Sequence, residues 1–249
     1  MIAITMGDGN GVGPEILLKA YVQGELQGEY MVWGDRGVLE YCSRKLGYEI
    51  PFHFAKDETD YCPDRLNVLD LGWLTEDDLT PGQVNAKVAA ASREYVVKAS
   101  EMALQGKFTA IVTLPVNKEA IRLTDPDFTG HTELIAGICG QTHYTMMLAS
   151  KALTVTHVST HVSMEQSIRN CKKERILEVI RLTWDALTRF QEHPVIAVAG
   201  LNPHAGENGA FGDQELTDIA PAVQAAREER MDVVGALPPD TVFLRGYRG

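Results

Sequence analysis

The sequence predicts an α/β protein with a mostly parallel sheet, and three observations support this fold class. Short β-branched or apolar runs alternate with longer amphipathic stretches, an order typical of strand-helix-strand units. Several of these runs lead directly into loops rich in glycine, asparagine or histidine, as at the carboxyl ends of strands in open parallel sheets. With 249 residues, the chain suits one large domain or two lobes that share a sheet.

Five strands are expected, each from a short apolar run bounded by polar residues or glycine. They cover residues 2–6, 29–33, 110–114, 153–158 and 195–199. No repeat and no long linker rich in glycine, serine or proline separates them. Any division into lobes therefore follows from the topology of the chain.

Four helices are expected between and after these strands. The first begins near Pro14, because proline is tolerated at the first helical position, and runs to about Tyr21. The second covers residues 81–105, with Pro81 near its start, an alanine-rich middle and Gly106 as its stop. The other two cover residues 171–190 and 215–229, the former with an apolar stripe at helical spacing. We expect these helices to support the fold and to carry little chemistry.

Composition and charge narrow the classes of function. The formal net charge of -11 disfavours nucleic acid and anionic membrane surfaces as partners. No apolar run approaches the ~20 residues that span a bilayer, and residues 1–8 lack the features of a secretory signal, so we expect a cytoplasmic protein. The four cysteines form no Cys-x-x-Cys pair, which predicts reduced thiols and no zinc knuckle or disulfide framework.

The loop after the first strand is rich in glycine and opens a helix. Glycines at 7, 9, 11 and 13 permit a tight backbone turn, and the following helix start offers unpaired N–H groups suited to an anion. The spacing differs from the G-x-G-x-x-G fingerprint of dinucleotide sites. A tight strand-to-helix turn without a ligand is the alternative interpretation.

Two further loops carry candidate substrate-binding residues. Lys118 follows the strand at 110–114, where ligands collect in parallel sheets, and could meet a carboxylate or phosphate. His131 and Thr132 lie beside Gly130, which allows a polar ligand to approach the backbone closely. The alternatives are a solvated lysine in the first turn of a helix and a surface histidine in a loop.

His161 and His204 follow two other strands, and imidazoles at neighbouring strand ends can converge on one divalent ion. Catalytic zinc takes three protein ligands and structural zinc four, so a carboxylate, another histidine or a second subunit must contribute. His157 falls inside the expected strand and is interpreted as a core or sheet residue. Metal-assisted hydrolysis with Glu207 or Asp213 as an extra ligand is an alternative that these two histidines allow.

Several separate motifs resemble those of the PdxA family, the 4-hydroxythreonine-4-phosphate dehydrogenases of vitamin B6 biosynthesis and their paralogues. Residues 4–8 and 11–15 (ITMGD and GVGPE) resemble the family's opening, and residues 130–133 (GHTE) its substrate loop. Thr160-His161 resembles its first metal histidine and residues 200–207 (GLNPHAGE) its second. Residues 237–243 (LPPDTVF) resemble the segment that follows. The likeness covers nearly the whole chain.

The resemblance implies a two-lobed α/β/α fold similar to that of isocitrate and isopropylmalate dehydrogenases. It implies a first lobe at 1–114, to which 237–249 return, and a second at 115–236 that carries the metal histidines. It also implies a homodimer whose partner subunit completes the active site in the cleft.

Family roles carry over to matching positions of this sequence. His131 and Thr132 would bind the phosphorylated substrate, His161 and His204 would hold the divalent metal, and Asp240 would lie near the reacting centre, where Asp240 or His131 relays a proton. The pattern leaves open zinc, magnesium or cobalt, NAD or NADP, and the residues that bind the nicotinamide cofactor.

The implied activity is a metal-dependent, NAD-linked dehydrogenation of a phosphorylated hydroxy acid, with 4-phosphohydroxy-L-threonine as the default substrate. The β-keto acid product can then lose carbon dioxide. Erythronate or threonate 4-phosphate and aromatic cis-dihydrodiols are the alternatives from paralogues.

Two departures accompany this resemblance. Gly9-Asn10 stands where family members usually have Pro-Ala. The sequence also ends before the family's His-Asp-Gln-Gly stretch with the third metal histidine and before a substrate-binding lysine, asparagine and arginine, so we expect the family fold without its C-terminal part. A catalytically silent homologue that binds metal or ligand weakly is therefore a further hypothesis.

Overall fold

A computed structural model describes residues 1–248, which form two compact units, Met1–Thr142 (unit 1) and residues 143–248 (unit 2). The units divide between Thr142 and His143, whereas the lobes implied by the resemblance divide after Leu114. Residues 115–142 belong to unit 1 because Ala120, Ile121 and Phe128 are buried against Ala89 of its longest helix. The chain after Leu237 belongs to unit 2. No helix within residues 1–248 has the length and apolarity needed to cross a lipid bilayer.

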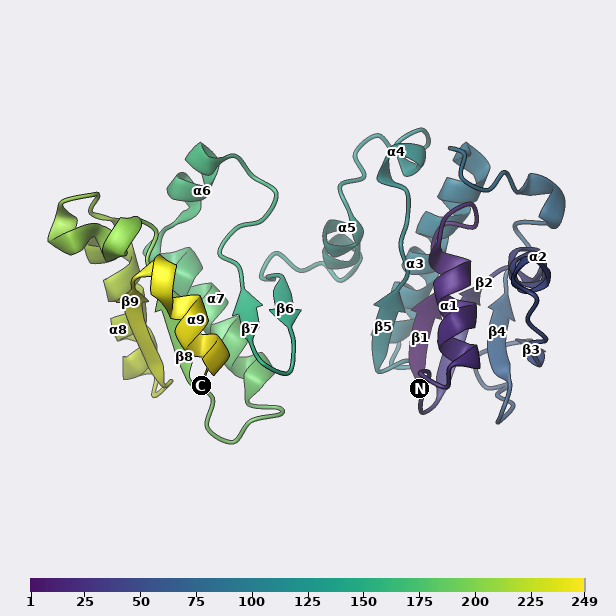
Figure 1. Cartoon of the computed structure of the whole chain (residues 1–249), viewed down its shortest axis with the longest axis horizontal. Coiled ribbons are helices and arrows are strands. Elements are labelled where there is room, and N and C mark those ends of the chain that lie inside the picture. Colours follow the sequence, from purple (N-terminus) through teal and green to yellow (C-terminus); the bar gives the residue numbers. More distant parts are fainter. Residues whose placement is uncertain (249) are drawn as a thin grey trace. The chain divides into compact units, whose positions relative to one another are not determined.

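Unit 1 is built on a five-stranded parallel sheet in the order β3-β4-β2-β1-β5 (Figure 1). Its strands are β1 (Ile2–Thr5), β2 (Tyr30–Gly34), β3 (Phe52–Ala55), β4 (Leu66–Asp70) and β5 (Ala110–Thr113). β2 is buried along its whole length, as expected for a central strand covered on both faces. The mostly parallel sheet predicted from the sequence is confirmed.

Helices cover both faces of this sheet, with α1 in front of it and α3 behind it in Figure 1. The helical elements of unit 1 are α1 (Gly13–Val22), α2 (Arg36–Leu46), η1 (Glu76–Asp78), α3 (Ala86–Leu104), α4 (Lys118–Ile121) and α5 (His131–Ile138). α3 begins at Ala86 and not near Pro81, because the Asn85 side chain caps it by accepting a hydrogen bond from the Val88 N–H at 3.2 Å. The core includes Met31, Val32, Leu39 and Tyr95.

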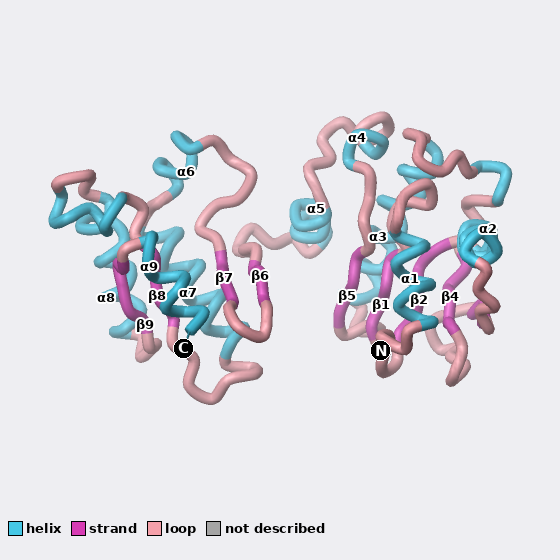
Figure 2. Tube along the Cα trace, in the orientation of Figure 1, coloured by secondary structure: helices cyan, strands magenta, loops and turns pink. Residues whose placement is uncertain are grey.

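Unit 2 contains two small sheets instead of one continuous sheet (Figure 2). β6 (Met147–Ala149) pairs antiparallel with β7 (Thr154–Thr156), and β8 (Ile196–Ala199) pairs parallel with β9 (Val233–Leu237). The helical elements are α6 (Met164–Asn170), α7 (Lys173–Leu187), η2 (Pro203–Gly209), η3 (Glu215–Ile219), α8 (Ala220–Glu228) and α9 (Pro239–Arg248).

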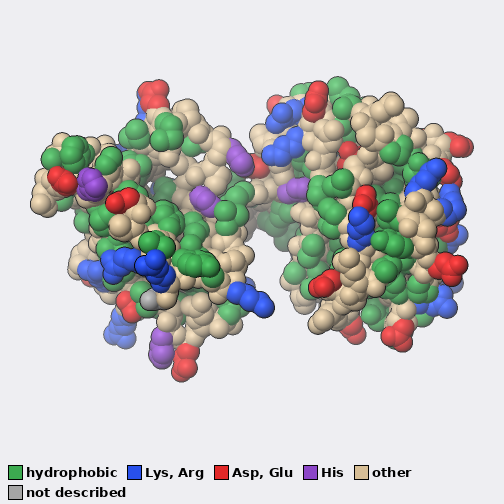
Figure 3. All heavy atoms as spheres, viewed as in Figure 1, with side chains coloured by type: hydrophobic (Ala, Val, Ile, Leu, Met, Phe, Trp, Pro, Cys, Tyr) green, Lys and Arg blue, Asp and Glu red, His purple; other side chains and the backbone are tan. Residues whose placement is uncertain are grey.

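The apolar core of unit 2 lies between α7, α8 and the β8-β9 pair. Ile176 and Ile180 of α7 pack with Val223 of α8 and Val233 of β9. The helix expected at 215–229 begins as one π-helical turn, η3, before it continues as α8. On the face shown in Figure 3, acidic and basic side chains are interspersed over each unit.

Candidate functional site

The loops that follow β1 and β5 touch at the carboxyl edge of the parallel sheet in unit 1. The Asp8 N–H donates a hydrogen bond to the Pro115 carbonyl oxygen at 3.0 Å. Gly7 has φ +76°, and a Cβ on it would lie 2.4 Å from the same oxygen, so only glycine fits. β1 pairs with β2 on one side and with β5 on the other, which makes this edge a topological switch point, where ligands bind in open α/β sheets.

Asn10 ties the glycine-rich loop to the segment before α3. Its Oδ1 accepts the Thr80 N–H at 2.8 Å, and its Nδ2 donates to Thr80 Oγ1 at 3.2 Å. Asp8 is also buried, and burial raises the pKa of its carboxyl group despite a hydrogen bond from the Asn10 N–H at 2.9 Å. The polar groups of the Asn10 amide thus form hydrogen bonds within the protein, at one of the positions where the sequence departs from the family pattern.

Lys118 and His131 are brought together in unit 1 by two capped helix starts. Asn117 caps α4 by accepting the Ala120 N–H at 3.1 Å, which places Lys118 at the first helical position. Gly130 caps α5 and places His131 at its first position. A Cβ on Gly130 would lie 3.2 Å from Lys118 Nζ, so the ammonium group approaches the start of α5 closely.

The imidazole of His131 is suited to bind a polar ligand. Burial, and secondly the positive charge of Lys118, lower the pKa of His131, which favours its neutral form. Its Nε2 is buried and has no hydrogen-bond partner among the described residues. An unpaired buried nitrogen costs free energy, which a ligand hydroxyl or carboxyl group could recover. Thr132 follows in the same first turn and is half-buried.

The two histidines predicted to bind metal both lie in unit 2, in loops that follow strands. His161 comes after β7, is exposed, and has a left-handed backbone with φ +57°. His204 comes after β8 in the turn η2, is also exposed, and has φ +54°. Left-handed backbone is uncommon for residues with a Cβ, and histidine is among those that adopt it most readily, so each histidine lies at a sharp turn of its loop.

Within residues 1–248, no group of three or more histidine, cysteine, aspartate or glutamate side chains gathers where it could hold a metal ion. Two imidazoles are fewer ligands than catalytic zinc takes from protein. The described residues therefore do not fit a complete metal centre, and the metal site at His161 and His204 stays a prediction.

Asp240, predicted to lie near the reacting centre, and His157, predicted to be a core or sheet residue, are also in unit 2. Asp240 is exposed in the first turn of α9, a helix that contacts η2, the turn of His204. His157 follows β7 directly, and its N–H donates to the Met146 carbonyl oxygen at 3.2 Å, as suits a residue of the hairpin. A residue that the sequence pattern did not reveal is Glu215, whose buried carboxylate accepts hydrogen bonds from the loop before His204.

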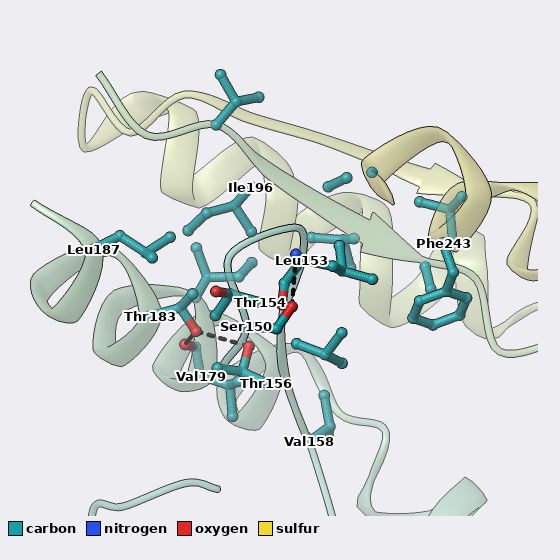
Figure 4. A pocket seen from close by; sticks show the side chains of 18 of the residues that line it. Ser150, Leu153, Thr154, Thr156, Val158, Val179, Thr183, Leu187, Ile196 and Phe243 are labelled. Carbon is teal, nitrogen blue, oxygen red and sulfur yellow. Dashed lines mark hydrogen bonds between the residues drawn. The ribbon is translucent and has the colours of Figure 1, made fainter. Parts of the chain in front are cut away.

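A pocket of about 420 Å³ lies elsewhere in unit 2, between β7, α7, β8 and α9 (Figure 4). Val179, Ile196 and Phe243 give it an apolar lining, and Thr183 Oγ1 donates to Thr156 Oγ1 at 2.9 Å beside it. His161, His204 and Asp240 do not line this pocket. Its lining offers few groups for acid-base or metal chemistry.

The chain is similar in sequence to known proteins along its whole length. Residues 27–249 match the family model described as pyridoxal phosphate biosynthetic protein PdxA. A relative from Oceanobacillus iheyensis, named as a putative D-threonate 4-phosphate dehydrogenase, is 42% identical over 100% of this chain and 77% of its own length. A 4-hydroxythreonine-4-phosphate dehydrogenase from Beijerinckia indica is 38% identical over 100% of this chain and 74% of its own.

A solved structure agrees with these relatives. The crystal structure of a 4-hydroxythreonine-4-phosphate dehydrogenase from Klebsiella pneumoniae superposes with a TM-score of 0.90 at 38% identity, covering 100% of this chain and 77% of that one. The chain thus spans about three quarters of the length of these relatives. The α/β fold, the match to the family model and the sequence identities lead to one conclusion: this chain belongs to the PdxA family of dehydrogenases.

Proposed function

We propose that the chain is an NAD-linked dehydrogenase of a phosphorylated four-carbon hydroxy acid, with D-threonate 4-phosphate as the first substrate to test. The Oceanobacillus iheyensis relative with that named activity is the more similar of the two relatives described above. The substrate implied by the sequence motifs, 4-phosphohydroxy-L-threonine, is the second candidate, since the Beijerinckia indica relative carries the corresponding name. Both compounds share a four-carbon chain with a terminal phosphate and a neighbouring hydroxyl group.

The observation that carries this proposal is the unpaired, buried Nε2 of His131 beside Lys118. In the proposed complex, the neutral imidazole hydrogen-bonds the substrate, and the Lys118 ammonium group attracts its carboxylate or phosphate. Thr132, in the same helical turn, adds a hydroxyl donor. These three residues would bind and orient the substrate, so that its hydroxyl carbon can give up a hydride to NAD.

The proposal includes a divalent metal at His161 and His204, which as a Lewis acid would make the substrate hydroxyl more acidic. Because residues 1–248 provide no group of three ligands, a further ligand is needed, and we propose that a second subunit of a homodimer supplies it. Asp240, on the helix that contacts the turn of His204, is the proposed proton acceptor.

The test is the appearance of reduced nicotinamide when the purified protein meets each candidate acid with NAD or NADP, with and without added zinc, magnesium or cobalt. Turnover of D-threonate 4-phosphate above the other acids is expected. His131→Asn should raise KM strongly, whereas Lys151→Met, which changes an exposed lysine of unit 2, serves as the control. Absence of turnover with every phosphorylated acid, cofactor and metal would contradict the proposal.

A further inference from the structure

The turn that carries His204 has an unusual backbone. All five residues 204–208 have φ between +42° and +77°. Two of them, Ala205 and Glu207, belong to residue types for which this region is unfavourable, whereas histidine and asparagine adopt it more readily. Such a run persists only where the surrounding structure imposes it.

The conformation is not explained by burial of the histidine. The imidazole of His204 is exposed, and the nearby Phe211 ring, 6.5 Å away between centroids, is exposed as well. Packing of the histidine side chain therefore gains little from the strained turn. Strain without such a gain is typical of segments that present a group to a ligand.

Glu215 is hydrogen-bonded to the residues that lead into this turn. Its Oε1 accepts the N–H groups of Leu201 at 2.8 Å and Asn202 at 2.7 Å, and its Oε2 accepts Asn202 Nδ2 at 2.9 Å. The side chain is buried, and a Cβ on Gly206 would lie 2.7 Å from Oε2. The carboxylate thus holds the start of the loop through hydrogen bonds, and its Oε2 leaves no room for a side chain at position 206.

The local structure around Glu215 keeps the carboxylate in place and charged. Burial acts to raise its pKa, but the hydrogen bonds from Asn202 and Leu201 outweigh this and lower the pKa of Glu215 below its usual value. Glu215 also begins η3, a π-helical turn, and such turns are frequent at functional sites. A left-handed turn and a π-helical turn therefore meet at one buried carboxylate.

We propose that Glu215 is a positioning residue, which touches no substrate and acts by holding the turn that presents His204 to its ligand. The inference rests on the proposed function only in that His204 takes part in ligand binding. Glu215 is fourteen positions from Leu201 and thirteen from Asn202, so it joins the loop after β8 to the helix that follows. Loss of the carboxylate should release the turn and leave the fold intact.

The central variant is Glu215→Gln, which keeps one carbonyl oxygen for the two backbone N–H groups but turns an NH₂ donor toward Asn202 Nδ2. The rescue variant Glu215→Gln/Asn202→Asp replaces that opposing donor with an acceptor. Glu192→Gln removes one acidic group from the same unit at a side chain that is 91% exposed, and is the matched control. Far-UV circular dichroism checks that each variant folds.

Hydrogen exchange gives a readout that does not depend on enzyme activity. Repulsion between the new NH₂ group and Asn202 Nδ2 should displace the remaining oxygen from both backbone N–H groups, so the amides of Leu201 and Asn202 should exchange about tenfold faster in Glu215→Gln. The amide of Val198 in β8 should be unchanged, and protection should return in the rescue variant. If the central variant does not fold, the rescue variant carries the comparison. Unchanged exchange at Leu201 and Asn202 in a folded Glu215→Gln protein would overturn the proposal.

Kinetics then distinguish positioning from general destabilisation. Glu215→Gln should lower kcat/KM by about 10- to 100-fold in the parent protein but have almost no effect when His204→Ala is already present. An equal loss in both backgrounds would overturn the proposal, because Glu215 would then not act through His204. If the parent protein turns over no substrate, the proposed function fails, and the exchange measurement still decides the role of Glu215 in the turn.

Discussion

The hydroxyl group of Tyr95 donates a hydrogen bond to Asp35 Oδ2 inside unit 1, where both side chains are fully buried. Asp35 Oδ1 accepts the Trp73 N–H at 2.7 Å, and the Trp73 and Tyr95 rings stack with centroids 5.6 Å apart. Burial, and then the neighbouring Asp35, raise the pKa of Tyr95, so the phenol stays protonated and remains a donor. This network joins the end of β2, the segment after β4 and the middle of α3.

Tyr95→Phe should therefore destabilise the protein. The variant keeps the ring but leaves the buried Asp35 carboxyl group without one partner, which costs about 1–3 kcal/mol. Urea denaturation measures the change in the free energy of unfolding. Tyr247→Phe, at a side chain that is 64% exposed, should change it by less than about 0.5 kcal/mol. Equal stability of the two variants would show that the Tyr95 hydrogen bond contributes nothing.

Asp8→Asn should stabilise the protein at neutral pH. Burial raises the pKa of Asp8 in the folded state above the ordinary 3.8 of an aspartate in an unfolded chain. A raised carboxyl pKa means that the ionised form disfavours folding, so stability falls as pH rises from 3.8 through the folded pKa. The advantage of Asp8→Asn should be largest above that window and shrink as pH falls through it, in urea titrations at several pH values.

Asp57→Asn should have the opposite effect on the stability of the protein. Hydrogen bonds from Thr59 lower the pKa of the exposed Asp57. Its contribution to stability is therefore present above 3.8 and lost as pH falls through the lower folded pKa. The two variants should diverge at neutral pH, and an advantage of Asp8→Asn that does not depend on pH would contradict the electrostatic explanation.

Short apolar runs were sufficient to predict four strands, whether fully buried as β2 or partly exposed as β5 and β8. The runs at 2–6, 29–33, 110–114 and 195–199 lie within one residue of β1, β2, β5 and β8 at each end. β3 and β4 were not predicted, because His53 and Asn67 interrupt their short apolar patterns. Asn67 is nevertheless fully buried, since its amide bonds the backbone of Cys62 at both its oxygen and its nitrogen. These hydrogen bonds form only in the folded protein, so no periodic pattern in the sequence predicts that Asn67 is buried.

Site residues were predictable where a charged or titratable side chain lies in a loop that follows a strand. They were not predictable where their role depends on contacts with residues distant in the sequence. The sequence predicts Lys118 and His131 as substrate-binding residues of two loops, and the structure brings the lysine close to the start of the histidine's helix. Glu215 lies in a stretch that reads as an ordinary amphipathic helix. Its role arises from a left-handed turn that forms ahead of it in the chain, and no spacing rule for helices anticipates that contact.

Lys118→Met should raise the pKa of His131. The lysine charge is the second cause, after burial, of the lowered pKa, so its removal should move the value upward without restoring it fully. Titration of the His131 imidazole by NMR measures this directly. Lys151→Met removes an exposed charge from unit 2 and should leave the His131 titration unchanged. An identical His131 pKa in both variants would mean that the two side chains are not close in solution.

Gly206→Ala should destabilise unit 2 more than Gly209→Ala does. Both glycines have positive φ, at +77° and +96°, so alanine is strained at either position by about 1–2 kcal/mol. At Gly206 the new Cβ would also lie 2.7 Å from Glu215 Oε2 and 3.0 Å from the Gly212 carbonyl oxygen, whereas at Gly209 it would meet only Leu216 Cδ1 at an ordinary 3.6 Å. The difference between the two variants in the free energy of unfolding therefore measures both close contacts together. Combined with Glu215→Ala, which removes the nearer oxygen, the excess cost of Gly206→Ala over Gly209→Ala should shrink. If the excess cost is undiminished in that background, the contact with Glu215 is not its source.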